Sequence, residues 1–557
     1  MKQCARFLGF TVLALAAVML PARAQDYCAW DHSLRLVNGR IHTMDASDRV
    51  VSEVTIQEGR FAFIGPVGNH KLSPCTKIID LHGRTAVPGL IDNHDHFILL
   101  SNRPGYEVQL EGITTIPTAL DALRGRAQEI PSGAWVLTIG DWLPRQFVEK
   151  RSPTLAELDR ALPDHPVFLW PGFQPAVTNS LGKKFFESKG VAVSDAGVIG
   201  PRDTGAAMNA LRAIWTPEDA VQGALFAQSY VLSHGLTTVQ DGGVFPLAGS
   251  PDLLDSDQTN MLASWNPWTA RDPIIALYHR HKLDVRVRFQ LRGEDTTMAL
   301  PILKQRLNNL YPDFGDDMVR NSEIGEYAVS WYTYDWQHGQ GPANFEAALE
   351  MIARRGWPFM QHTLSLKEVQ FTAKNYQAVN AVTPISGLHW SIAHVPQIDQ
   401  ASLDAMKRLN VGLALHGWRY LQGRQGTPAN IPAGPPYRTI LESGIHVGAG
   451  SDGGDISEID PWFDIFYMVT GKDITGEVIN DGEQVTRQQA LRMYTADNGW
   501  FFREENELGS IEPGKLGDLV VLSDDYFDPR KVPDEQITKL KSVLTIVGGR
   551  VVYSDLR

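Results

Sequence analysis

The stretch VPGLIDNHDHF, residues 87–97, ends an apolar run with two histidines that a single aspartate separates. On a β-strand, side chains two residues apart point to the same face, so His94 and His96 can bind one cation from one side. The pair alone is weak evidence, because 16 histidines among 557 residues give about 0.5 such pairs by chance. His279 and His281 have the same spacing within a segment of helical periodicity, where residues two apart diverge. We therefore expect His94 and His96 on a strand and the second pair at a solvated helix end.

Other apolar runs along the chain also end in polar residues. Eight such runs can be counted as parallel strands, ending near His94–His96, Gln240–Asp241, Gln290–Arg292, Ser330–Tyr332, Gln361–His362, Ala393–His394, Leu415–His416 and Ser451–Asp452. Helical segments alternate with them; one begins at Thr216-Pro217-Glu218-Asp219, with a capping threonine and a proline in the first turn. Strand and helix alternation over this length predicts an α/β protein with a (β/α)8 TIM barrel.

Histidine and aspartate stand at several of these strand ends. His362 ends PFMQH, His394 ends LHWSIAH and Asp452 ends HVGAGSD, each after an apolar run. In such barrels the chemistry collects at the carboxyl ends of the strands. Imidazole and carboxylate suit zinc and neighbouring first-row metals. The sequence therefore predicts a metal site at that end of the barrel, built by these three residues with His94 and His96.

The two ends of the chain have a different texture from the middle. Short alternating runs broken by Asn-Gly, Glu-Gly and His-Gly fill residues 33–81, and GDLVVLSDD and SVLTIVGGRVVYS repeat that texture near the C-terminus. This pattern is typical of antiparallel hairpins. We expect one β-sandwich built from residues 25–84 and 501–557, flanking a barrel at 85–500 that carries an insertion at about 105–205.

The N-terminus has the layout of a secretory signal peptide over residues 1–24. Lys2 and Arg6 precede an apolar run from Leu8 to Leu20, and Ala22-Arg23-Ala24 is a cleavage signal. The alternative is an uncleaved anchor, although the run is short for a membrane span and no later segment has 18 uninterrupted apolar residues. We expect an exported chain, periplasmic or secreted, with no stable membrane span after cleavage.

Two cysteines remain in the exported chain, Cys28 and Cys75. In an oxidising compartment they are candidates for a disulfide, and two unrelated buried thiols are the alternative.

Charge and motif patterns exclude other classes of function. The formal net charge of −13 becomes −16 once Lys2, Arg6 and Arg23 leave with the signal peptide, so nucleic acid is not expected as a partner. The run from Gly448 to Gly453 fits the dinucleotide-binding pattern G-x-G-x-x-G, but Pro461 and no apolar helical stripe follow it. A small-molecule substrate is the expected partner, and a homo-oligomer stays open.

Together these motifs resemble the metal-dependent amidohydrolase superfamily, and within it amidohydrolase family 3. The resemblance rests on VPGLIDNHDH, the later lone histidines, GSD, and GSIEPGKLGDLVVLSDD, and it covers most of the chain. The insertion, with GDWLPRQFVE, PDHPVFLW and Asn179-Ser180, looks like the branch that includes N-substituted formamide deformylases. The resemblance implies a distorted (β/α)8 barrel beside a β-sandwich. It also implies that the four histidines bind metal, and that Asp452 contacts the metal and shuttles a proton.

One departure from that family concerns the fourth strand. Many relatives carry a lysine there that bridges two metals, whereas SEIGEYAVSWYTYDWQHG, residues 322–339, contains none. Placing AVSWY on the strand puts Ser330 at the lysine position, and Glu326 or Asp335 could supply a carboxylate instead. A single divalent ion, zinc in the first place, is therefore favoured over two.

The expected reaction is hydrolysis of an amide-type carbon–nitrogen bond, in which Asp452 moves a proton from water to the leaving nitrogen. His416, or His394 if it is not a full ligand, is a candidate donor to the developing oxyanion. Aromatic residues beside the site suit a small apolar or aromatic substrate. The pocket candidates are Arg292, Trp331, Tyr332, His416 and Arg419. An ester or lactone hydrolase and a non-catalytic metal-containing binding protein are the alternatives.

Overall fold

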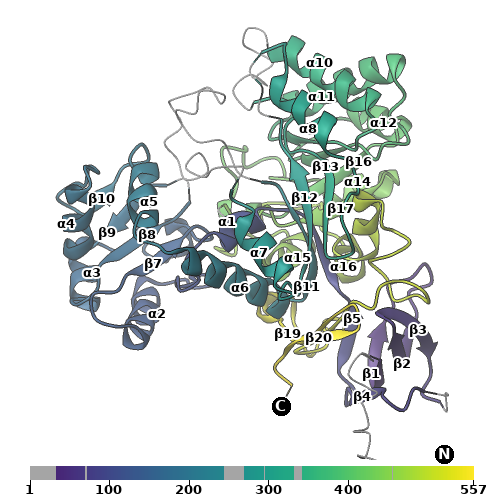
Figure 1. Cartoon of the computed structure of the whole chain (residues 1–557), viewed down its shortest axis with the longest axis horizontal. Coiled ribbons are helices and arrows are strands. Elements are labelled where there is room, and N and C mark those ends of the chain that lie inside the picture. The colour runs from purple at the N-terminus through teal and green to yellow at the C-terminus, as the bar shows by residue number, and fades with distance from the viewer. Residues whose placement is uncertain are drawn as a thin grey trace, which may run out of the picture.

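The computed structural model describes residues 33–68, 72–172, 174–243, 269–293, 295, 297–330, 341–454 and 456–556. Two parallel four-stranded sheets form its centre (Figure 1). One has the order β13-β12-β11-β6, from β6 (Leu90–Asp95), β11 (Leu236–Asp241), β12 (Arg286–Leu291) and β13 (Val319–Ile324). The other has the order β14-β15-β16-β17, from β14 (Met360–Thr363), β15 (Ser391–His394), β16 (Gly412–His416) and β17 (Val447–Gly450). Almost all residues of these strands are buried, as in parallel sheets covered on both faces.

Hydrogen bonds join the two sheets at both pairs of edges. On one side, the amide of Ile324 donates to the carbonyl of Pro358 (3.1 Å) and that of His362 donates to Glu326 (3.0 Å). On the other side, the amide of Asp452 donates to the carbonyl of His94 (2.9 Å). The eight strands therefore follow one another around a TIM-barrel-like α/β core.

Helices follow most of the central strands and cover them from outside. They are α1 (Phe97–Ser101), α6 (Pro217–Ser233), α7 (Asp272–His279), α8 (Pro301–Asn309), α10 (Gly341–Arg354), α11 (Leu366–Val382), α12 (Gln400–Arg408), α13 (Arg419–Gln422), α14 (Tyr437–Ser443), α15 (Pro461–Thr470) and α16 (Arg487–Met493). The predicted start of α6 is confirmed, because the hydroxyl of Thr216 accepts the amide of Asp219 in a capping box. Among the described residues, no helix is long and apolar enough to cross a membrane.

Seven of the eight predicted strand positions are confirmed, and the fourth is wrong. The fourth strand is VRNSEI, residues 319–324, and not AVSWY, so Ser330 does not take the lysine position. The strand was missed because its charged residues find partners inside the fold that sequence periodicity does not show. Arg320 pairs with Glu504, and Glu323 accepts hydrogen bonds from Gln240 and Gln290.

Both ends of the chain meet in one eight-stranded sheet. Its order is β20-β19-β18-β5-β1-β2-β3, with β4 paired to β1, and it has its own apolar core. The strands are β1 (Leu34–His42), β2 (Val50–Gln57), β3 (Arg60–Gly65), β4 (Lys77–Asp80), β5 (Thr85–Pro88), β18 (Leu519–Leu522), β19 (Ser542–Val547) and β20 (Arg550–Ser554). The sheet continues past residue 84 to Pro88, and the β-sandwich itself stays a prediction.

A further sheet is built between α1 and α6, and in Figure 1 it lies to one side of the central strands. It has the order β10-β9-β8-β7, from β7 (Val136–Ile139), β8 (Val167–Trp170), β9 (Ala176–Thr178) and β10 (Val198–Ile199). Helices α2 (Ile116–Glu129), α3 (Leu155–Ala161), α4 (Ser180–Ser188) and α5 (Thr204–Arg212) belong to the same stretch. Arg103, which pairs with Asp141, also donates to the carbonyl of Gly454 and so ties this sheet to the loop after β17.

A buried ion pair joins the central strands to the terminal sheet, and its removal should destabilise the fold. Arg286 of β12 holds both carboxylate oxygens of Asp518 (2.7 and 2.9 Å). Asp518→Ala leaves the buried guanidinium without its carboxylate partner, so we expect a loss of about 3–5 kcal/mol in the free energy of unfolding.

Chemical denaturation measures that loss, and Glu129→Ala is its control. Glu129 pairs with Arg126 at the surface, where the expected change is within about 0.5 kcal/mol. Equal effects of the two substitutions would contradict a coupling role for the buried pair.

Candidate metal centre

Seven donor side chains come together at the carboxyl ends of the central strands, and all are buried. They form overlapping groups whose ligand atoms lie within 4.8 Å of one another: His94, His96 and Asp452; Glu326, His362 and His394; and His94, His394 and His416. The structure thus brings together all five predicted metal ligands, with Glu326 and His416 beside them. His279 and His281, by contrast, are exposed at the end of α7, as expected.

The oxygen atoms of two carboxylates lie among these imidazoles. Oδ1 of Asp452 is 3.5 Å from Nε2 of His94 and 3.4 Å from Nε2 of His96. Oε1 of Glu326 is 3.5 Å from Nε2 of His362 and 3.7 Å from Nε2 of both His394 and His94. Glu326 therefore belongs to the group of His362 and His394 and also lies near His94 of the other group.

These residues fit a divalent ion by their chemistry and by their lack of other partners. Among the described residues, neither ring nitrogen of His94, nor Nε2 of His394, has a hydrogen-bond partner. Buried polar atoms without partners cost free energy, so their gathering at one point calls for a ligand. Imidazole nitrogens with carboxylate oxygens are donors that suit zinc.

Glu326, one of the two candidates to replace the missing lysine, places a carboxylate in the donor cluster. It lies two residues beyond β13, and its other oxygen, Oε2, accepts a hydrogen bond from Arg292 (2.7 Å). Burial raises the pKa of Glu326, but His362 and Arg292 outweigh it, and the pKa lies well below its usual range. Arg292, a predicted pocket residue, therefore orients Glu326, and its guanidinium also stacks on Tyr327.

Asp452 and His394 both have backbone conformations that residues other than glycine rarely adopt. Their φ angles are +53° and +69°, in the left-handed region. Such strain clusters at functional sites, where the surrounding structure holds a side chain in one direction. Burial raises the pKa of Asp452, but the nearby His394 and His94 outweigh it, so the pKa lies well below its usual range. The carboxylate is thus held in its ionised form.

Two of the surrounding imidazoles favour the neutral form that binds metal, whereas for His96 burial is outweighed by Asp452 and Glu326, which raise its pKa to about 9. Burial lowers the pKa of His362 to about 3, and it brings that of His416 well below its usual range. Neutral imidazole has a free nitrogen lone pair, which is what a metal ion needs.

Sequence reasoning missed a second layer behind the donors. Asp92 accepts the amide of His94 (3.1 Å) and both the amide and the hydroxyl of Ser451, the latter at 2.6 Å. Nδ1 of His96 lies 3.0 Å from the carbonyl oxygen of Gly243. Burial raises the pKa of Asp92 to about 7. The available signal was an aspartate two residues before His94, and so on the same strand face.

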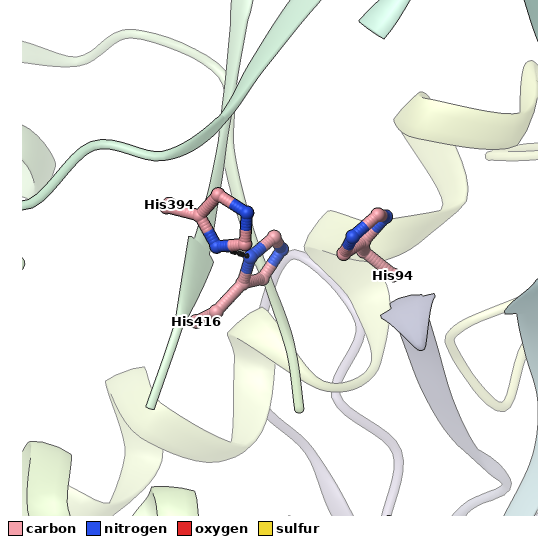
Figure 2. A group of neighbouring side chains, drawn as sticks. All are labelled: His94, His394 and His416. Carbon is pink, nitrogen blue, oxygen red and sulfur yellow. Dashed lines mark hydrogen bonds between the residues drawn. The ribbon is translucent and has the colours of Figure 1, made fainter. Parts of the chain in front are cut away.

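His416 contacts both neighbouring imidazoles (Figure 2). Its Nδ1 lies 2.7 Å from Nδ1 of His394, and its ring stacks on that of His94 with centroids 4.7 Å apart. The ring of Trp418 lies 6.3 Å from that of His394. Arg419 donates to the carbonyls of its own loop, at Gly423 and Arg424, and its guanidinium stacks on Trp418.

Several predicted residues lie outside the described part of the chain. They are Trp331, Tyr332, Asp335 and Cys28. The disulfide between Cys28 and Cys75 therefore stays a prediction.

Comparison with known proteins supports the chemistry of this site. The sequence profile of the amidohydrolase family matches residues 77–553. The chain is 24% identical to the N-substituted formamide deformylase of Arthrobacter pascens, over 93% of this chain and 98% of that protein. It is 23% identical to a putative amidohydrolase of Bacillus subtilis, over 92% of this chain and 98% of that protein.

Solved structures share the fold. An uncharacterized metal-dependent hydrolase from Pyrococcus furiosus matches with a TM-score of 0.59 and 19% identity, over 89% of this chain and 100% of that one. Atrazine chlorohydrolase from Arthrobacter aurescens, solved with zinc, matches with a TM-score of 0.54 and 16% identity, over 94% and 95% of the two chains. The chain therefore belongs to the amidohydrolase family and is a metal-dependent hydrolase that acts on carbon–nitrogen bonds.

Proposed function

We propose that this chain hydrolyses an amide-type bond in a small apolar or aromatic substrate, with Asp452 as the proton shuttle. The observation that carries the proposal is the gathering of four histidines, Glu326 and Asp452 in one buried cluster, with ring nitrogens that lack hydrogen-bond partners. Such a set of donors at the carboxyl ends of the central strands is where this fold places its chemistry.

The donors divide into two sets for two divalent ions, most simply zinc. His94, His96 and Asp452 form the first set, and Glu326, His362 and His394 form the second. The expectation of a single ion rested on the absent lysine, and Glu326 now supplies a carboxylate between the sets. Divalent ions held there would polarise the substrate carbonyl and lower the pKa of a water molecule.

The chain's own part in the reaction is proton transfer and orientation. Asp452 accepts a proton from the attacking water as the oxygen–carbon bond forms, and delivers it to the nitrogen as the carbon–nitrogen bond breaks. The products are a carboxylic acid and an amine. Oδ1 of Asp452 lies near His94 and His96, and Oδ2 of Asp452 is 3.6 Å from Nδ1 of His394, so both oxygens face the cluster.

Aromatic rings beside the donors support an apolar or aromatic substrate. Tyr327 stacks on His362 with centroids 4.9 Å apart, and Trp418 lies near His394. The related deformylase acts on N-substituted formamides by its name. Aromatic N-substituted formamides are therefore the first substrates to assay.

We also propose that the mature chain begins at Gln25 and is exported. The positive residues Lys2 and Arg6, the apolar run after them and the cleavage signal that ends at Ala24 support this. Mass determination of the protein recovered from the periplasm or medium tests it.

Metal content is the first measurement on the purified protein. We expect about two equivalents per chain by elemental analysis, since two sets of donors are present. His94→Ala should lower the count and abolish hydrolysis, because His94 belongs to the first set and also borders Glu326.

His279→Ala is the matched control, since His279 has the same spacing to its partner but is exposed on α7. It should keep full metal content and activity. One equivalent in the wild-type protein would restore the single-ion expectation. No bound ion after reloading would leave a binding protein as the better account.

Asp452→Asn tests the proton shuttle. The amide cannot accept the proton, so we expect kcat for formamide hydrolysis to fall by about 10²–10⁴-fold. Steady-state kinetics measures the fall, with Asp195→Asn, at an exposed site, as the control.

Matched formate esters distinguish amide from ester chemistry in the same assay. A preference of the wild-type protein for the esters would favour an ester or lactone hydrolase. An unchanged kcat in Asp452→Asn would remove Asp452 from the mechanism.

A further inference from the structure

Two neighbouring strands place a pair of histidines in direct contact at the metal centre. His394 ends β15 and His416 ends β16, and both side chains are fully buried. Their Nδ1 atoms are 2.7 Å apart, which is a hydrogen bond (Figure 2). The other neighbour of Nδ1 in His394 is Oδ2 of Asp452 at 3.6 Å, beyond hydrogen-bond range. His416 is therefore the partner of this nitrogen.

The direction of this hydrogen bond decides which nitrogen of His394 is free to bind metal. A neutral imidazole carries one N–H, so one of the two Nδ1 atoms must donate and the other accept. If His394 donates through Nδ1, its Nε2 has a lone pair directed toward Oε1 of Glu326, 3.7 Å away. If His416 donates instead, Nε2 of His394 carries the proton and cannot bind metal. Metal binding by His394 thus requires His416 to accept.

The position of His416 is held by packing as well. Its ring stacks on that of His94, with an angle of 15° between the planes. The ring of His394 meets the ring of His416 at an angle of 82°, with centroids 4.5 Å apart. His416 is therefore wedged between two donor histidines, and it contacts only one of them through a hydrogen bond.

We propose that His416 is a positioning residue that accepts the Nδ1 proton of His394 and so presents Nε2 of His394 to the metal. The proposal rests on the metal centre of the proposed function. A histidine that binds metal commonly donates its other N–H to an oxygen acceptor, and loss of that acceptor weakens metal binding by about 10–100-fold. Here a second imidazole is the acceptor.

Two substitutions separate the acceptor from the packing. His416→Phe keeps a ring that can stack on His94 but has no acceptor. His416→Asn loses the ring but can place Oδ1 near the position of Nδ1 and accept the proton. His446→Phe is the control, since His446 also stacks on an aromatic ring, that of Trp500, away from the donor cluster.

The readout is zinc affinity, measured by competition with a chromophoric chelator, together with the visible absorption of the cobalt-substituted protein. We expect His416→Phe to bind the ion that His394 holds about 10–100-fold less tightly than the wild-type protein does, and to alter the cobalt spectrum. His416→Asn should bind within about threefold of the wild-type protein, and His446→Phe should match it. Circular dichroism of the metal-free proteins checks that each variant is folded.

Two results would overturn the positioning role. Wild-type affinity in His416→Phe would show that no acceptor is needed. An affinity in His416→Asn as weak as in His416→Phe would show that His416 acts through Nε2, as a ligand of its own. Both results differ from a failure of the proposed function, in which the wild-type protein binds no metal and the two proposals fall together.

Discussion

Seven imidazole and carboxylate side chains lie around one buried point, and the surrounding structure has to hold them there. Each buried polar atom that lacks a partner costs free energy of folding. His94 carries two such atoms and His394 carries one. The apolar strands and the helices around them supply the favourable burial that offsets this cost. The outcome is a set of donors that a metal ion can satisfy better than the protein does.

Three of these donors are each held by a hydrogen bond with a neighbouring residue. Arg292 donates to Glu326, Asp92 accepts the amide of His94, and His416 bonds His394. Each of these hydrogen bonds fixes the orientation of the donor residue, and the one from Arg292 also pairs with the charge of Glu326. Small displacements of a reacting group cost large factors in rate, so such supports matter for catalysis as much as for stability.

The sheets outside the core also reach the site. Arg103 lies just before the sheet β7–β10, pairs with Asp141 and donates to the carbonyl of Gly454, two residues after Asp452. The loop that carries Asp452 is therefore braced from the inserted sheet. Arg286 and Asp518 make a similar link between β12 and the terminal sheet, at the other end of the same core.

The sequence by itself determined most of the core and most of the donors. Apolar runs that end in histidine or aspartate are local patterns, and they predicted seven central strands together with His94, His96, His362, His394 and Asp452. The strand VRNSEI escaped, because its half-buried Arg320 and its buried Glu323 find partners in Glu504 and Gln240, which are far away in the sequence. The tertiary structure alone decided that Glu326 enters the site and that His416 pairs with His394. Both depend on how strands that are distant in the chain come together, and a local sequence pattern does not show which of them will be neighbours.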